Sequence, residues 1–189
     1  MASVFARTLA FARRATAGGA LSRFRRNENG ATVVEFALVA APFFALMFAI
    51  IETALLFFAD QTLDTAVSSA ARLIRTGQAQ DEGLTANAFK TAICDQMGGL
   101  LSCSAGLKVD VRKYTSFDSI DLATPVDADG NLKVTENYNT GHGGDIVVVR
   151  AYYEWPTFVP LLGNNLANMP DGTHLLVATA AFRNEPFAW

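Results

Sequence analysis

The feature that most constrains this chain is a long apolar run that follows a short basic segment. Phe36–Ile51 carries no charge, and the stretch 31–59 contains only four polar residues: Thr32, Glu35, Glu52 and Thr53. As an α-helix, Phe36–Ala59 would be about 36 Å long, enough to cross a bilayer core of about 30 Å. The sequence therefore predicts a membrane-spanning helix over residues 31–59.

Two other kinds of segment also contain an apolar helix. One is the core helix of a soluble protein, but the rest of this 189-residue chain is too small to surround such a helix on all sides. The other is a cleaved secretory signal peptide, which needs an apolar region of about 7–15 residues followed by a small-x-small site. The run here is longer, and its end, Leu56–Asp60, has no such site. We therefore favour a retained anchor.

Charge is distributed unevenly along the chain. Six basic residues and one acid precede Ala31, whereas nine basic and seventeen acidic residues follow from Ala31 onward. A basic arm before an apolar run predicts a cytoplasmic N-terminus, and the acidic remainder argues against nucleic acid as a partner. A mitochondrial transit peptide would also be rich in arginine and poor in acids. Because the apolar run begins directly after the arm, residues 1–30 are interpreted as a basic cytoplasmic leader.

Two carboxylates and a proline lie inside the run. A carboxylate placed in lipid costs about 2.5–3.5 kcal/mol on insertion scales, so Glu35 and Glu52 are expected to face protein or headgroups. For Glu52, simple extension of the side chain to the outer interface is an equal alternative. Pro42 lacks an amide N–H and is expected to kink or loosen the helix.

The segment Gly30–Phe36 resembles the cleavage motif of type IV prepilins: a basic leader, a glycine, and a glutamate at the fifth position of the mature chain. The resemblance implies that a prepilin peptidase, a membrane aspartyl protease, cuts between Gly30 and Ala31. Glycine offers such an enzyme an unhindered and flexible backbone. The new amine at Ala31 would be a positive charge in an apolar assembly, and Glu35 of a neighbouring subunit is expected to neutralise it.

Beyond the run, residues 60–78 keep a helical pattern and are predicted to form a helical stalk. One apolar stripe recurs at helical spacing: Leu63, Val67, Ala70 and Ile74. Acids lie early and arginines late, which complements the helix dipole, and Gly77 is a suitable C-cap. The sequence thus predicts one helix of about 45 residues from Ala31, whose outer part packs on its own chain in preference to another helix.

Residues 79–189 are predicted to form a small domain of the α+β class. A helix is expected over Thr85–Met97. Alternating or β-branched residues predict four strands: Leu107–Arg112, Asp145–Trp155, His174–Arg183 and a short one over Leu132–Thr135. The predicted fold is therefore α+β, with a long N-terminal transmembrane helix that continues into a small periplasmic pilin-like domain with an antiparallel sheet.

The chain has two cysteines, Cys94 and Cys103. Beyond a bacterial inner membrane they would lie in an oxidising compartment, so a disulfide is predicted. A metal site and a redox pair are the alternatives, but no histidine lies nearby and the spacing is not C-x-x-C. Asp127–Asn131 contains a D-x-D-G pattern that falls short of an EF-hand loop and is interpreted as a hairpin turn. No metal or cofactor is expected.

A narrower resemblance rests on several segments between residues 23 and 187. They are ATVVEFALVAAPFFALMFAIIE, SAARLIRTG, the CDQM…LLSC spacing, GGDIVVVRAYYEW and the terminal FRNEPF. Together they resemble the TadE-like family of Tad (tight adherence, Flp-type IV) pilus systems. The family implies a minor pseudopilin that crosses the bacterial inner membrane once, with its N-terminus in the cytoplasm and its C-terminal domain in the periplasm. The implied partners are the prepilin peptidase, other Tad assembly proteins and pilins.

Phe36 departs from the Flp-type motif, which favours tyrosine after the glutamate, and the leader is long. A second hypothesis therefore stays open: an uncleaved single-pass inner-membrane scaffold or binding protein whose periplasmic sheet contacts a partner. An enzyme is not expected, because the two histidines, His142 and His174, lie in no recognisable catalytic motif.

Overall fold

A computed structural model describes residues 30–99, 101–103, 106–158 and 166–187. Apart from Gly30, the predicted leader lies outside these residues. The chain divides into two compact units, Met1–Phe44 and Ala45–Trp189, and the division falls inside the first described helix. The second unit contains the sheet and the hydrophobic core.

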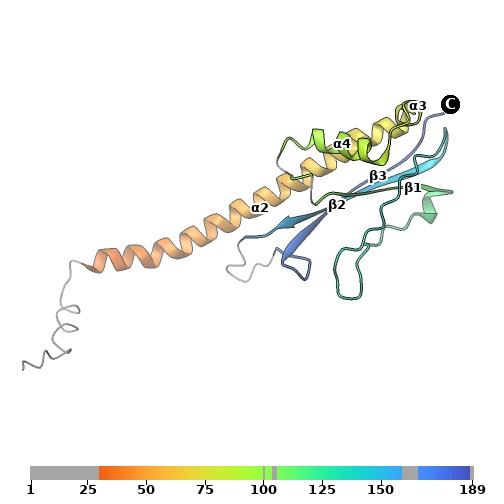
Figure 1. Ribbon diagram of the computed structural model, residues 1–189. Coiled ribbons are helices and arrows are strands. Elements are labelled where there is room, and N and C mark those ends of the chain that lie inside the picture. The colour runs from red at the N-terminus through yellow and green to blue at the C-terminus, as the bar shows by residue number, and fades with distance from the viewer. Residues whose placement is uncertain (1–29, 100, 104–105, 159–165, 188–189) are drawn as a thin grey trace, which may run out of the picture. The chain divides into compact units, whose positions relative to one another are not determined.

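Helix α2 comprises 45 residues, Ala31–Arg75, and continues through Pro42 (Figure 1). Its first residue and its length confirm the prediction of one long helix that begins at Ala31. Proline removes one amide donor from a helix, yet the residues on both sides of Pro42 keep the helical conformation. Arg72 and Arg75 lie in the last turn, where basic side chains complement the helix dipole.

Gly77 ends this helix, as predicted. Its backbone is left-handed, with φ 84°, which glycine adopts without steric cost, and its amide donates to the carbonyl of Ile74 at 3.1 Å. A Cβ at this position would lie 2.7 Å from the ring of Phe187, so the close approach also requires glycine. Helix α2 therefore ends at Arg75, slightly before the predicted end of the stalk, and the short helix α3, Gln78–Asp81, follows.

Helix α4, Ala86–Gln96, confirms the helix predicted over Thr85–Met97. Thr85 is its N-cap, and the Thr85 hydroxyl accepts a hydrogen bond from a first-turn amide at 3.2 Å. Phe89 and Ile93 lie one turn apart and are fully buried. The helix thus packs one face into the core and leaves the other to solvent.

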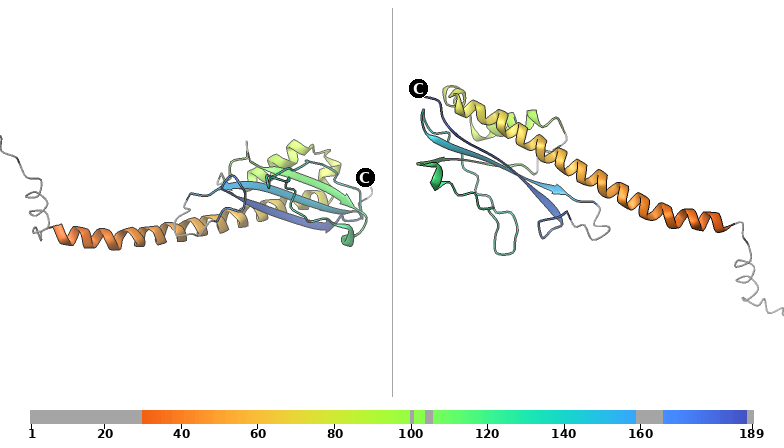
Figure 2. Two further views of the ribbon diagram at one scale, coloured as in Figure 1. Left: turned by 90° about the horizontal axis from the view of Figure 1, so that it is seen from below. Right: turned by 180° about the vertical axis from the view of Figure 1, so that it is seen from behind.

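Three strands form one antiparallel sheet (Figures 1 and 2): β1 Lys108–Tyr114, β2 Ile146–Pro156 and β3 Thr173–Arg183, in the order β1-β2-β3. The three long strands predicted from the sequence are thereby confirmed, with small shifts at their ends. In the central strand β2, Val149 faces Val111 of β1 and Ala180 of β3. Residues 146–153 are buried whichever face they point to, which suits a strand rich in β-branched and aromatic residues.

The two edges of the sheet differ. Residues 137–139 run along the outer edge of β1, where the amide of Val111 donates to the carbonyl of Asn137 at 2.8 Å and its carbonyl accepts from the amide of Asn139 at 3.0 Å. The side chain of Asn168 covers the beginning of the outer edge of β3, where its Oδ1 accepts from the amide of Leu175 at 2.7 Å and its Nδ2 donates to the carbonyl of Leu175 at 3.5 Å. Beyond Leu175, no described strand pairs with this edge. The sheet therefore has one edge covered by residues 137–139 and one edge that is open beyond Leu175.

The short strand predicted over Leu132–Thr135 is wrong, because the structure has only a single bridge there, between Val126 and Leu132. The carboxylate of Asp127 accepts hydrogen bonds from the amides two and four residues later, at 3.0 and 2.9 Å. These bonds hold the segment in a turn, and the chain diverges after one pair of residues. The same bonds explain the D-x-D-G pattern, since the Asp127 oxygen serves the backbone of its own turn.

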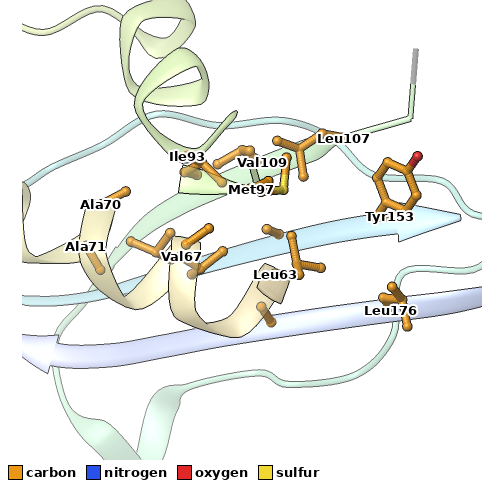
Figure 3. Packing of buried hydrophobic residues seen from close by; sticks show 14 of the residues in the cluster. Leu63, Val67, Ala70, Ala71, Ile93, Met97, Leu107, Val109, Tyr153 and Leu176 are labelled. Atoms are coloured by element: carbon orange, nitrogen blue, oxygen red, sulfur yellow. The ribbon is translucent and has the colours of Figure 1, made fainter. Parts of the chain in front are cut away.

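The core of the second unit lies between two helices and one face of the sheet (Figure 3). Side chains from α2, α4 and all three strands meet there: Leu63, Val67, Ile74, Phe89, Ile93, Val109, Val147, Val149 and Leu176. The stripe predicted on α2 is buried in full, with no member more than 3% exposed. The prediction that the outer part of this helix packs on its own chain is therefore confirmed.

The opposite face of the sheet is covered by irregular segments. Tyr152 of β2 is 1% exposed and packs with Met169 and Leu175. Beside it, the guanidinium of Arg150 donates to the backbone carbonyls of residues 121–123 at 3.0–3.5 Å and lies 5.1 Å from the centre of the Tyr152 ring. This arginine, which the sequence did not single out, ties a polar segment to the centre of the sheet.

Candidate functional site

The predicted cleavage site lies at the start of α2. Gly30 immediately precedes the helix and is exposed, and a Cβ added to it would meet nothing within 4 Å. Ala31, the first helical residue, is exposed as well. In the described part of the chain nothing covers the bond between them, which is what a peptidase needs in a substrate.

Glu35 lies one helical turn after Ala31. Residues four apart share a face of the helix, with their Cβ atoms about 5–6 Å apart. The neighbours of Glu35 are strongly exposed, Val34 at 59% and Phe36 at 68%. An acid and the proposed new amine therefore occupy one face of the same helix, surrounded by apolar side chains.

The apolar side chains of the run point outward. Between Val33 and Phe58, fourteen large apolar side chains are 44–71% exposed. The helix is long and apolar enough to cross a membrane, and none of its most apolar window is buried. A core helix of a soluble protein would be mostly buried, so this surface favours the predicted membrane anchor over that alternative.

Glu52 has a different environment from Glu35. It is 6% exposed, and its carboxylate accepts a hydrogen bond from the backbone amide of Phe158, just after β2. The sequence left open whether Glu52 faces protein or extends to the interface, and the structure shows that it faces protein. The hydroxyl of Thr53 donates to the carbonyl of Ala49 at 2.8 Å. Both polar side chains in this part of the run are therefore hydrogen-bonded.

Cys94 and Cys103 form a disulfide, as predicted. It joins α4 to the segment that leads into β1 and leaves no free cysteine in the described chain. Next to it, the amide of Ser102 donates to the hydroxyl of Tyr153 in β2 at 3.2 Å. A covalent link and a hydrogen bond thus hold this connection against the core. No group of three or more potential metal ligands occurs among the described residues.

A groove of about 730 Å³ lies between α2 and β3. Arg72 and Arg75 line its helical side, and residues 179–182 line its sheet side. Arg75 pairs with Glu185 at 3.6 Å, but both side chains are more than half exposed, so the pair is weakly held. The groove was not predicted, because no local pattern indicates which helix residues will lie beside which strand.

Beyond Leu175, the strand beside this groove has an outer edge with which no described strand pairs. Edge strands usually carry charges, prolines or bulges that prevent another strand from adding to them. Between Thr173 and Phe182, β3 contains no charged residue other than the titratable His174, no proline and no glycine. Its sequence therefore leaves the open edge available to an extended segment of another chain.

Hydrogen bonds hold the loop before β2 on β1. The Nζ of Lys113 and the amide of His142 each lie 2.8 Å from Oδ2 of Asp145. The hydrogen bond from Lys113, and then that from His142, lowers the pKa of Asp145. The ring of the other histidine, His174, contacts the carbonyl of Leu166 through Nδ1. Both histidines thus lie in local structural contacts.

The helix and the domain together define a class of protein: a small α+β domain that follows a helix able to cross a membrane. Within that class, the family model described as TadE-like protein matches residues 30–72. This match confirms the predicted resemblance over most of α2, and similarity to a family of this description suggests a component associated with Tad pili. The match begins at Gly30, and residues 73–189 lie outside it. Comparisons with curated proteins and with solved structures give no match.

Proposed function

We propose that this chain is a minor pseudopilin, or membrane-anchored assembly component, of a Tad (Flp-type IV) pilus or a related secretion system. The observation that carries the proposal is the coincidence of three features at one point. Helix α2 begins at Ala31, directly after the glycine of the motif, and Glu35 follows one turn later. The TadE-like match starts at the same glycine.

In the proposed mechanism, prepilin peptidase cuts between Gly30 and Ala31 on the cytoplasmic side of the inner membrane. The cut leaves an ammonium group at the positive end of the α2 dipole, where a cation is disfavoured. In an apolar assembly this charge needs a partner. Glu35 of a neighbouring subunit supplies a carboxylate and so couples processing to assembly.

The remaining parts have supporting roles. The basic leader keeps the N-terminus in the cytoplasm, the apolar surface of α2 contacts lipid or other pilin helices, and the α+β domain meets pilins and other Tad assembly proteins in the periplasm. No catalytic step is assigned to this chain: neither histidine lies in a recognisable catalytic motif, the ring of His174 contacts a backbone carbonyl, and Lys113 and Asp145 pair with each other.

Mass spectrometry of the chain from its native membrane tests this function. We expect a mature chain that starts at Ala31 whenever an active prepilin peptidase is present. The variant Gly30→Ala should accumulate with its leader intact, because the added Cβ hinders access to the bond. Gly19→Ala, also in the leader, is the matched control and should be processed normally.

A chain that keeps its original start beside an active peptidase would contradict the proposal and support a second candidate. That candidate is an uncleaved single-pass scaffold that binds a partner in the periplasm. The open edge of β3 and the adjoining groove favour it, since an extended segment could add there as a fourth strand.

A further inference from the structure

The chain returns from the sheet to the apolar run of α2. Because the carboxylate of Glu52 accepts a hydrogen bond from the amide of Phe158, the backbone at Phe158 lies level with residue 52 of the helix. The end of the apolar run, Ala59, lies about 10 Å further along the helix axis. The backbone at Phe158, two residues after β2, therefore reaches a level inside the run, not beyond it.

Two placements of a bilayer core fit the charges of α2. Ala31–Ile51 begins at the proposed new N-terminus and stops before Glu52, whereas Phe36–Leu55 begins after Glu35. Each is about 30 Å long as an α-helix, the thickness of the core. Residue 52 lies at the outer edge of the core in the first placement and within the core in the second. Both put Phe158 no further out than the boundary between acyl chains and headgroups.

The side chains near this level are apolar and uncovered. Phe158 is 72% exposed, compared with 71% for Leu38, the most exposed large apolar side chain of the run. Phe57 and Phe58 are 69% and 61% exposed and follow Glu52 within two helical turns. Phe57 and Phe58 continue the apolar surface of α2. If lipid surrounds the run, it therefore surrounds these two rings as well.

We propose that Phe158 forms a second lipid-contacting element that enters the outer leaflet beside the span. The proposal rests on the membrane anchor of the proposed function. In this arrangement the amide of Phe158 gives Glu52 a hydrogen bond that acyl chains cannot supply, while the Phe158 ring replaces the carboxylate at the lipid surface. The domain is then attached to the membrane at two points, the helix and the end of β2.

Phe117 provides a matched control in the same domain. It is 52% exposed and lies in the short helix η2, Phe117–Ser119, which follows the end of β1. Because Tyr114 at that end pairs with Ile146 at the beginning of β2, η2 lies at the opposite end of the sheet from Phe158. A ring at this position should stay in water.

The depth of each position can be measured by nitroxide quenching. The full chain, with its disulfide oxidised, would carry an environment-sensitive fluorophore on a single added cysteine, in Phe43→Cys, Phe158→Cys or Phe117→Cys. Each variant would be reconstituted into phosphatidylcholine–phosphatidylglycerol vesicles that contain a nitroxide either near the headgroup or deep in the acyl chain. We expect the deep nitroxide to quench a fluorophore at position 43 and the shallow nitroxide to quench one at position 158. Neither nitroxide should quench a fluorophore at position 117.

The outcomes separate the two proposals. Loss at 43 without loss at 158 would overturn the second lipid contact and leave the span intact. Equal loss at 158 and 117 would also overturn it, because the domain would then lie on the membrane without a specific contact. Absence of quenching at 43 would overturn the membrane anchor itself, and both proposals with it.

Discussion

Asp145 is the residue through which acid should weaken the domain. Hydrogen bonds from Lys113 and from the amide of His142 lower its pKa. Because the folded-state pKa lies below the unfolded value of about 3.9, the stabilisation is fully present above that value. It is lost as the pH falls through the folded-state pKa. The free energy of unfolding should therefore decrease below about pH 4.

The variant Asp145→Asn should lose this part of the acid sensitivity. We expect the variant to be less stable than the unsubstituted chain at neutral pH by less than about 1 kcal/mol, because the ion pair is partly exposed. The difference should shrink in acid. Urea unfolding in detergent, followed by tryptophan fluorescence at several pH values, measures it. Asp129→Asn, in the exposed turn, is the control, and parallel pH profiles for Asp145→Asn and the unsubstituted chain would contradict the assignment.

Glu35 and Glu52 show which residue-scale features a sequence can predict. The role proposed for Glu35 depends on its distance from Gly30 along the chain, which the sequence displays directly. The environment of Glu52 depends on Phe158, which is 106 positions away. No local pattern encodes such a contact, so its burial became visible only in the folded chain.

Helix α2 serves two environments along one continuous element. Between Val33 and Phe58 fourteen large apolar side chains are exposed, whereas Glu52, Leu56 and one face of the helix from Ala59 onward are buried against the domain. The two properties overlap between Glu52 and Phe58. Substitutions before and after this stretch should therefore affect different properties: insertion in the first case and folding of the domain in the second.

Leu63→Ala should destabilise the domain by about 2–5 kcal/mol, because Leu63 is fully buried and its truncation leaves a cavity. Insertion into the membrane should be unchanged. Urea unfolding reports the first effect and resistance to alkaline extraction the second. Asp64→Ala, one residue away and exposed, is the matched control. Similar unfolding midpoints for the two variants would show that this face of α2 is not part of the core.

The elements that the sequence predicted well are those defined by periodicity. The apolar stripe on α2, the C-cap at Gly77 and the β-branched residues of β2 each act over a few neighbouring residues. The open edge of β3, the groove beside it and the Arg150 contacts depend on which elements become neighbours, and no single segment contains that information. The strand expected at Leu132–Thr135 failed because the Asp127 side chain competes for the backbone of the turn.

For the whole molecule, the disulfide reports on which side of the membrane the domain lies. A bond between Cys94 and Cys103 persists only in an oxidising compartment. Acid added to intact cells would trap the oxidation state of the two cysteines. We expect the chain not to react with a large maleimide reagent before reduction, and to gain two maleimide labels after it. On the chain-entropy model, reduction should lower the stability by about 2.7 kcal/mol.

Labelling of both cysteines before reduction would place the domain in the cytoplasm and would contradict the proposed orientation. The double variant Cys94→Ser/Cys103→Ser is the control for labelling and should gain no mass under either condition.

The central position of β2 has a consequence for how the protein is made. Its two partners flank it in the chain, so the sheet cannot be completed until β3, which ends at Arg183, has been synthesised and, in the proposed orientation, exported. Helix α2 is available for insertion long before that, while the face that it will bury has nothing to pack on. We therefore expect anchoring to precede completion of the domain. In the proposed topology, a chain that stalls before β3 would be anchored but would lack one strand of its sheet, and the apolar core left uncovered would make it a substrate for quality-control proteases.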